Sequence, residues 1–170
     1  MMTRHLTVFL CGFMGCGKST VGKKLANLMN CEFYDLDSII EQKQGMKISD
    51  IFEKHGEDYF RQCERDTLSQ FRGKVGVIAI GGGTMLSDEN AAIVNEVGLS
   101  VFIDTSFDIC YHRIKGDKKR PIAYNSSKKQ LQEIFNQRYP IYKIKAELSV
   151  LGKKSPSKIA ANIFTLSHSL

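Results

Sequence analysis

The sequence lacks the spacings that build a disulfide or zinc framework. No two of its five cysteines form a C-x-x-C pair, and an odd number argues against a closed set of disulfides. None of the four histidines stands at a zinc-ligand spacing from a thiol. We therefore expect no structural zinc and a reducing, cytoplasmic location. The cysteines are Cys11, Cys16, Cys31, Cys63 and Cys110.

Long apolar stretches, internal repeats and low-complexity tracts are also missing. The apolar run at residues 6–11 is too short to cross a membrane and lacks a small-residue cleavage site, so it predicts a buried strand. A chain of 170 residues with 42% hydrophobic content suits a single core. We expect one domain over residues 1–170 and no membrane partner.

Acidic residues are outnumbered, 18 Asp and Glu against 24 Lys and Arg, which gives a formal net charge of +6. Such a surplus favours anionic partners such as nucleotides or carboxylate metabolites. The basic residues are scattered, and no base-reading motif accompanies them. The charge therefore predicts small anionic ligands rather than nucleic acid.

The most informative segment is residues 12–19, GFMGCGKS, which fits G-x-x-x-x-G-K-[ST] directly after the apolar run. Glycines in such a loop let successive backbone N–H groups surround phosphate, at the positive end of the following helix. Lys18 would reach the β and γ phosphates, Ser19 would ligate Mg²⁺, and Thr20 would extend the polar helix start. The alternative, a glycine-rich turn that fits by chance, is disfavoured by the flanking strand and amphipathic helix. The predicted phosphate-binding glycines are Gly12, Gly15 and Gly17.

Cys16 stands inside this phosphate loop. A helix N-terminus lowers the pKa of a nearby thiol, so a regulatory cysteine is one interpretation. A small residue packed under the loop is the favoured one, with its backbone counted among the nucleotide-binding groups.

Strand-like runs alternate with helix-period segments along the whole chain. This alternation is typical of an α/β fold with a mostly parallel sheet. The expected strands cover residues 6–11, 31–34, 75–80, 100–103 and 148–150. The expected helices cover residues 17–29, 37–43, 48–55, 57–71, 88–96, 106–115, 127–139 and 156–166.

Polar and flexible residues follow the second and third expected strands. Ligands of open α/β sheets bind outside the carboxyl ends of the strands, where Asp35 and Asp37 would lie. Strand alternation would put both carboxylates on one side, near the metal and an acceptor hydroxyl. The alternative is that Asp37 only caps a helix beginning at Ser38.

The glycines at residues 81–83 follow the third expected strand. They would let a ligand press against main chain, or else form a tight turn.

Residues 116–126 carry charge, proline and small polar side chains but no sustained period. Such a segment adds little to a core. It is either a mobile loop over the site or a plain surface loop.

Taken together, these segments resemble the shikimate kinase family in kind and in order. The resemblance covers nearly the whole chain and is carried by the phosphate loop and by residues 35–37, 59–64, 81–83, 120–121 and 138–142. It implies a P-loop kinase fold, a three-layer α/β arrangement with a five-stranded parallel sheet flanked by helices. It also implies transfer of the γ-phosphoryl group of ATP to the 3-hydroxyl of shikimate. The product shikimate 3-phosphate belongs to chorismate and aromatic amino-acid synthesis.

The resemblance also implies roles for individual residues on the acceptor side. Asp37 would contact the acceptor hydroxyl and take its proton. Glu64, three residues after Arg61 on one helix face, would orient that arginine. Two guanidinium groups converging on one carboxylate would fix the acid end of the ring. The implied shikimate-binding residues are Asp37, Arg61, Gly81, Gly82, Gly83 and Arg138.

On the nucleotide side the resemblance makes Lys18 and Arg120 catalytic together with Asp37. Arg120 would close onto the transferring phosphate from a lid at about residues 114–126. Arg113 and Lys154 fall where the family binds adenine. Asp35 would join Ser19 in holding Mg²⁺, through water. We expect a monomer that binds ATP and shikimate.

Two rival hypotheses remain at this point. A kinase for another small hydroxy acid, such as gluconate, would share the phosphate loop and the sheet. A non-catalytic module that binds ATP to regulate a partner would not need Arg61, Arg138 and Asp37 together.

Overall fold

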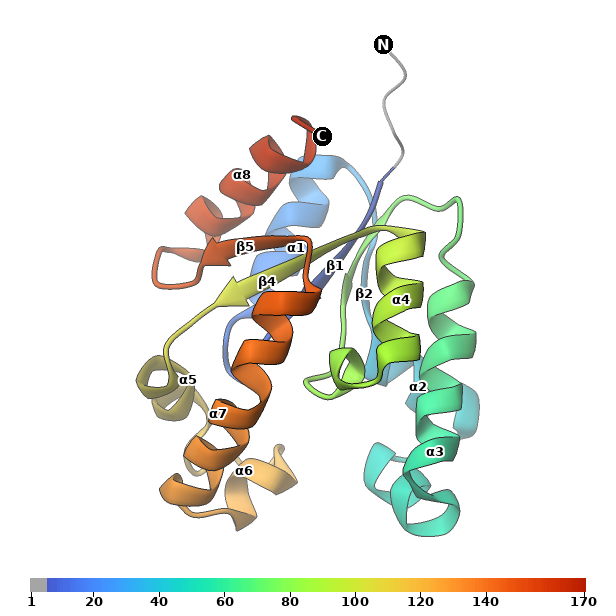
Figure 1. Cartoon of the computed structure of the whole chain (residues 1–170), viewed down its shortest axis with the longest axis vertical. Helices are drawn as coiled ribbons and strands as arrows, with labels where there is room; N and C mark the ends of the chain where they lie inside the picture. Colours follow the sequence, from blue (N-terminus) through green and yellow to red (C-terminus); the bar gives the residue numbers. More distant parts are fainter. Residues whose placement is uncertain (1–5) are drawn as a thin grey trace.

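The computed structural model describes residues 6–170 and contains a parallel five-stranded sheet (Figure 1). The strand order is β2-β3-β1-β4-β5, and every neighbouring pair is parallel. The central strand β1 therefore pairs with β3 on one side and with β4 on the other, with Val8 opposite both Val77 and Leu99. The strands are β1 (Thr7–Cys11), β2 (Phe33–Asp35), β3 (Gly76–Ala79), β4 (Leu99–Asp104) and β5 (Leu148–Leu151).

Helices cover both faces of this sheet. In Figure 1, α4 and α7 lie in front of the strands, while α1 lies behind them and packs against α8. The arrangement is the three-layer α/β fold that the sequence predicts. The helices are α1 (Lys18–Met29), α2 (Leu36–Gln44), α3 (Ile48–Ser69), the 3₁₀ helix η1 (Thr84–Leu86), α4 (Asp88–Val97), α5 (Phe107–Ile114), α6 (Pro121–Asn125), α7 (Lys128–Lys145) and α8 (Pro156–Ser167).

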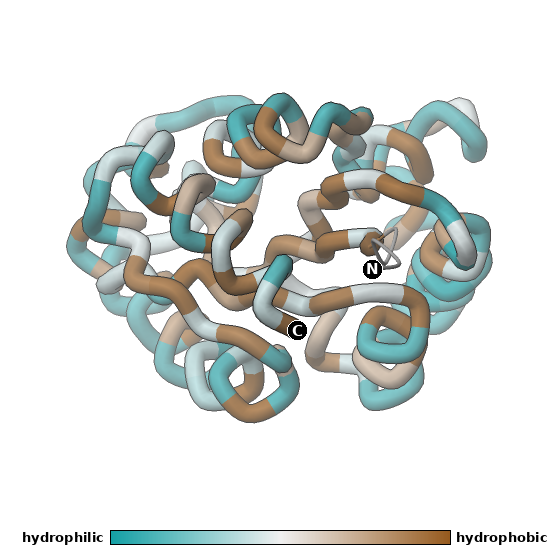
Figure 2. The backbone as a smooth tube through the Cα atoms, turned by 90° about the horizontal axis from the view of Figure 1, so that it is seen from above, coloured by the Kyte–Doolittle hydropathy of each residue, from teal (hydrophilic) through white to brown (hydrophobic). Residues whose placement is uncertain are grey.

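The core lies between the sheet and its helices. All residues of β1 and β3 are buried, as a parallel sheet covered on both faces requires. Figure 2 shows the apolar strands crossing the middle of the molecule and helices that alternate between apolar and polar residues around them. Because all the strands are parallel, their carboxyl ends lie at the same edge of the sheet.

Two boundaries differ from the expectations, and one expected helix break is confirmed. The expected end of a helix at residue 139 is wrong, because α7 continues through Pro140 to Lys145. Proline removes one helix hydrogen bond, and packing of the buried Tyr142 accompanies the continued helix. The expected helix break near residue 56 is correct, since Gly56 interrupts α3 with φ 83° and ψ 175°. The segment 116–126 is not wholly irregular, because it contains α6.

The carboxyl ends of the strands place the loops that carry the predicted site. The phosphate loop follows β1, the aspartate pair follows β2, and the glycines follow β3. This edge lies at the lower end of the sheet in Figure 1, flanked by α6 and by the start of α3. Among residues 6–170, no helix has both the length and the apolar character needed to cross a membrane.

Candidate active site

The phosphate loop curls at the end of β1 because all three of its glycines adopt positive φ. Gly15 has φ 82°, and a Cβ there would lie 2.8 Å from Cys110 O. Gly17 has φ 106° and caps α1 without a side chain. The first turn of α1 therefore faces the cavity with its backbone uncovered, as phosphate binding at a helix N-terminus requires.

Hydrogen bonds within the loop fix its shape. Lys18 Nζ donates to Gly12 O at 2.7 Å and to Phe13 O at 3.2 Å. The N–H of Cys16 donates to Phe13 O at 3.0 Å, so this group is engaged inside the loop. The Cys16 side chain is only 1% exposed, which confirms the expectation of a residue packed under the loop.

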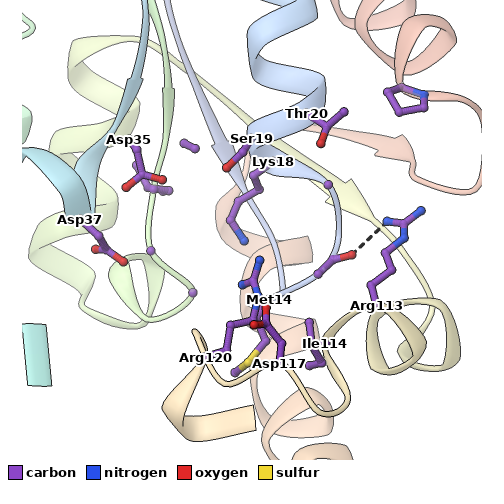
Figure 3. A pocket seen from close by; sticks show the side chains of 17 residues that line it. Met14, Lys18, Ser19, Thr20, Asp35, Asp37, Arg113, Ile114, Asp117 and Arg120 are labelled. Atoms are coloured by element: carbon purple, nitrogen blue, oxygen red, sulfur yellow. Dashed lines mark hydrogen bonds and ion pairs between the residues drawn. The ribbon is translucent and has the colours of Figure 1, made fainter. Parts of the chain in front are cut away.

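A cavity of about 560 Å³ opens in front of this loop (Figure 3). Lys18 lies at its centre, Asp35 and Asp37 face it from one side, and Arg120 approaches from below in Figure 3. The cavity joins the phosphate loop to the turn after β3, so a nucleotide and a second substrate can meet in it. Its lining residues are Met14, Gly15, Gly17, Lys18, Ser19, Thr20, Asp35, Asp37, Ala79, Ile80, Gly81, Gly82, Arg113, Ile114, Asp117, Arg120 and Pro156.

The aspartate pair reaches the cavity by a different route from the one expected. Strand β2 ends at Asp35, whose Oδ1 accepts the N–H of Ser38 at 3.0 Å and so caps α2. The alternative in which Asp37 is the cap is therefore wrong. Asp37 lies in the first turn of α2 rather than on a strand, so helix geometry and not strand alternation brings it beside Asp35.

Asp37 is the most perturbed acid of the cavity. Burial raises its pKa to about 6, and the nearby carboxylates of Asp35 and Glu64 add to the rise, while Lys18 opposes it. Its Oδ1 is buried and has no hydrogen-bond partner within residues 6–170. A Cβ at Gly81 would lie 3.1 Å from this oxygen, so the absence of a side chain there leaves room beside it. An unpartnered buried carboxylate oxygen is suited to a hydroxyl donor from a ligand.

Arg61 is held beside the glycine turn by a buried acid. Its Nη1 donates to Glu64 Oε2 at 2.7 Å, which agrees with the expectation that Glu64 orients this arginine. Glu64 is fully buried and also accepts Thr84 Oγ1 at 2.6 Å and Asn90 Nδ2 at 2.7 Å. A Cβ at Gly83 would lie 2.5 Å from Arg61 Nη2, so a side chain there would displace the guanidinium from this position.

Arg138 reaches the same turn from α7. A Cβ at Gly82 would lie 3.0 Å from Arg138 Nη1, so the guanidinium packs directly on this glycine. Tyr142, one turn later, donates from Oη to Gly82 O. Lys145 Nζ donates to Met85 O at 2.9 Å and to Leu86 O at 3.3 Å. These bonds attach α7 along the turn and fix where Arg138 lies.

The segment before α6 supplies the remaining cation. Arg120 Nε lies 3.3 Å from Asp117 Oδ2, and both side chains line the cavity. Arg113, on α5, donates from Nη1 to Gly15 O at 2.9 Å, the bond dashed in Figure 3.

Some expected residues lie outside the cavity lining. Gly12 and Cys16 belong to the phosphate loop but do not line the cavity. Lys154 lines a separate cavity of about 400 Å³ with Ser155 and Lys158. Arg61, Gly83 and Arg138 do not line the cavity. Arg138 packs on Gly82, which does line it, and Arg61 packs on the next residue, Gly83.

Sequence reasoning missed Thr84 and Asn90, the partners of Glu64. Asn90 is a fully buried polar residue beside the buried Ala91 and Val94 of α4. A polar residue within an apolar helix stripe is the signal that could have drawn attention to it.

Comparison with known proteins identifies the family. The family model described as shikimate kinase matches residues 14–167. A shikimate kinase from Sulfurihydrogenibium sp. is 39% identical over 93% of this chain and 95% of its own length. The chain belongs to the shikimate kinase family. A shikimate kinase from Acinetobacter baumannii, solved in complex with shikimate, superposes with a TM-score of 0.86 at 33% identity, over 96% of this chain and 93% of the other.

A second solved shikimate kinase, from Aquifex aeolicus, has a TM-score of 0.81 at 36% identity and covers 96% of both chains. Membership in the shikimate kinase family confirms the resemblance, the P-loop kinase fold and the expectation of an ATP-dependent kinase.

Proposed function

We propose that this chain transfers the γ-phosphoryl group of ATP to the 3-hydroxyl of shikimate, giving shikimate 3-phosphate and ADP for chorismate synthesis. The observation that carries the proposal is the buried Oδ1 of Asp37, which has no partner among the described residues. Asp37 lines the cavity together with Lys18. A hydroxyl acceptor bonded there would lie beside the phosphate loop.

Arg61 and Arg138 would hold the carboxylate of the acceptor. Both guanidinium groups pack on adjacent glycines of one turn, Gly83 and Gly82, although they come from α3 and α7. A guanidinium binds a carboxylate through two parallel N–H bonds, so this pair selects a planar acid. Gly81 to Gly83 would form the wall against which the ring lies. With the acid end fixed, the opposite side of the ring would point its hydroxyl toward Asp37.

Transfer itself would depend on position and charge. Lys18 and Arg120 would neutralise the charge on the transferring group, while backbone N–H groups of the phosphate loop, with Ser19 and Thr20, hold the phosphates. Asp37 is mostly ionised at neutral pH, since its pKa is about 6, so it would accept the proton of the hydroxyl. Because phosphoryl transfer is dominated by positioning, this proton transfer would add less to the rate than alignment does.

Ser19 and Asp35 would hold the Mg²⁺ that accompanies ATP. Both line the cavity, and a hydroxyl and a carboxylate are hard oxygen ligands of the kind that Mg²⁺ prefers. One oxygen of Asp35 accepts the Ser38 N–H, which fixes the carboxylate and leaves its other oxygen for a metal-bound water. The ion, when bound, neutralises phosphate charge.

The remaining parts of the proposal concern the outer site and the working unit. Arg113 would bind adenine from α5, with Lys154 contributing from the loop before α8. Residues 114–126 would act as a lid within one domain, bringing Arg120 onto the phosphate. All the proposed groups come from one chain, which supports a monomer, and the five free cysteines support a cytoplasmic location.

An acceptor panel tests the proposal directly. ADP release would be followed with MgATP and either shikimate, gluconate or no acceptor. We expect turnover that depends on shikimate and none above background with gluconate. Tight ATP binding without transfer to any acceptor would instead indicate a regulatory module, and no shikimate-dependent turnover would refute the proposal.

A further inference from the structure

A buried threonine outside the phosphate-loop motif donates a hydrogen bond to the loop. Thr105 directly follows β4, is 2% exposed, and donates from Oγ1 to Cys16 O at 3.2 Å. The two residues are 89 positions apart in the sequence. The bond therefore joins the end of a core strand to the middle of the phosphate loop.

This bond determines how one peptide group of the loop is oriented. Cys16 O and the N–H of Gly17 belong to the same peptide, and the described residues contain no cis peptide bond. In a planar trans peptide, the C=O and the N–H point in opposite directions. Thr105 holds the C=O toward the end of β4, so the Gly17 N–H points away from Thr105, and Gly17 lines the cavity.

The Gly17 N–H is also available for a ligand. Within residues 6–170 it has no acceptor in the protein, whereas the preceding N–H, that of Cys16, is engaged by Phe13 O. A correctly turned Gly17 N–H is one of the donors by which such a loop surrounds phosphate oxygens.

The Thr105 hydroxyl is itself confined. Gly152 packs on it so closely that a Cβ there would overlap Oγ1, and the Gly152 N–H donates to Asp104 O at 2.8 Å. A β-branched side chain has few rotamers, so the threonine holds its hydroxyl in one place. The corner between β5 and α8 thus supports the loop through Thr105.

We propose that Thr105 is a positioning residue for ATP, which turns the peptide between Cys16 and Gly17 so that the Gly17 N–H faces a nucleotide phosphate. This deepens the proposed function on its nucleotide side. The threonine touches neither substrate and acts only through the loop.

Thr105→Val tests the proposal, because it removes the hydroxyl and keeps the shape. Loss of one oriented donor predicts about 5-fold weaker ADP binding by calorimetry and a similar rise in KM for ATP. The KM for shikimate is expected to stay within about 2-fold, since no acceptor group is moved. Thr105→Ser, which retains a hydroxyl, should restore most of the ADP affinity.

Thr7→Val is the matched control. Thr7 is also buried and donates to a backbone carbonyl, Lys74 O. It lies at the start of β1, whereas the phosphate loop follows the end of that strand. We expect a comparable loss of thermal stability in both variants and weaker ADP binding only in Thr105→Val. Unchanged ADP affinity in Thr105→Val, or equal weakening in Thr7→Val, would overturn the proposal.

Two further points keep the test decisive. If Thr105→Val does not fold, Thr105→Ala removes the same hydroxyl with less crowding at Gly152 and carries the same expectation. ADP binding needs no acceptor, so the absence of shikimate turnover in the unaltered chain would count against the proposed function and not against the role of Thr105.

Discussion

The two halves of the proposed site are assembled in opposite ways. The nucleotide side comes mainly from residues 12–20, one continuous stretch at the end of β1. The acceptor side collects Asp37 from α2, Arg61 from α3, the glycines after β3 and Arg138 from α7. One half is built by local backbone geometry and the other by tertiary packing.

This difference determines what each half depends on. The phosphate loop uses glycine conformations and backbone N–H groups, which neighbouring residues largely define. The arginines need supports far away in sequence, such as Glu64 with Asn90, and Tyr142 with Gly82. We therefore expect substitutions on the nucleotide side to affect transfer, and substitutions among the supports of the acceptor side to affect acceptor binding selectively.

The largest expected effect is on the nucleotide side. Lys18→Ala removes the cation nearest the phosphate loop, and loss of one such group should lower kcat by about 10²–10³-fold. Shikimate binding measured by calorimetry should change by less than about 2-fold, since Lys18 is proposed to touch phosphate only. Lys23→Ala, exposed on the same helix, is the control and should have full activity. If Lys18→Ala weakened shikimate binding as strongly as it lowered kcat, the two halves would not be separate.

The next effect is on the acceptor side. Arg138→Ala removes one of the two proposed carboxylate ligands and should raise the KM for shikimate by about 50-fold, with little change for ATP. Arg65→Ala provides a matched loss of charge, because Arg65 pairs with the exposed Glu89 at 2.9 Å. It should leave both constants unchanged. Equal effects of Arg138→Ala on both substrates would show that this arginine does not serve the acceptor alone.

A smaller effect on shikimate binding tests the residues that hold the arginines in place. Glu64 accepts bonds from Arg61, Thr84 and Asn90, and a glutamine there would offer one oxygen to three donors. Glu64→Gln should therefore release Arg61 and raise the KM for shikimate by about 10-fold, with a smaller change in kcat. The control is Glu57→Gln, which alters the exposed partner of the same arginine, 3.3 Å away. We expect it to change the KM for shikimate by less than 2-fold, because exposed ion pairs are weak.

The same difference, between structure set by neighbouring residues and structure set by contacts distant in sequence, explains how well the fold could be predicted. Apolar runs located every strand to within about two residues, because helices cover both faces of the sheet and its central strands are buried throughout. The continuation of α7 through Pro140 was missed, since tertiary packing outweighed the local signal of a proline. The short helix α6 was missed because five residues show no period.

The site divides in the same way. The phosphate loop could be predicted from a contiguous motif, and the aspartates from their place after a strand. Thr84, Asn90 and Thr105 could not, because each acts through a residue that is 20, 26 or 89 positions away. Asp35 was expected as a metal ligand, but its part in capping α2 appeared only in the folded chain.

The smallest expected effect concerns stability rather than catalysis. Asp37 has a pKa of about 6 in the folded protein, above its ordinary value of 3.8, so the folded state binds more protons than the unfolded state between these values. Ionisation of Asp37 therefore destabilises the fold as pH rises, by at most about 3 kcal/mol above pH 6. Asp37→Asn removes this penalty and should raise Tm at pH 7 by about 5 °C.

The advantage of Asp37→Asn should shrink toward zero at pH 4, where the unaltered carboxyl is protonated. Asp58→Asn, an exposed change on α3, should match the unaltered protein at both pH values. A stability difference for Asp37→Asn that is the same at pH 4 and pH 7 would show that the carboxylate carries no buried charge. The expected result would instead mean that the acceptor side keeps, at a cost in stability, an ionised oxygen that only a ligand can satisfy.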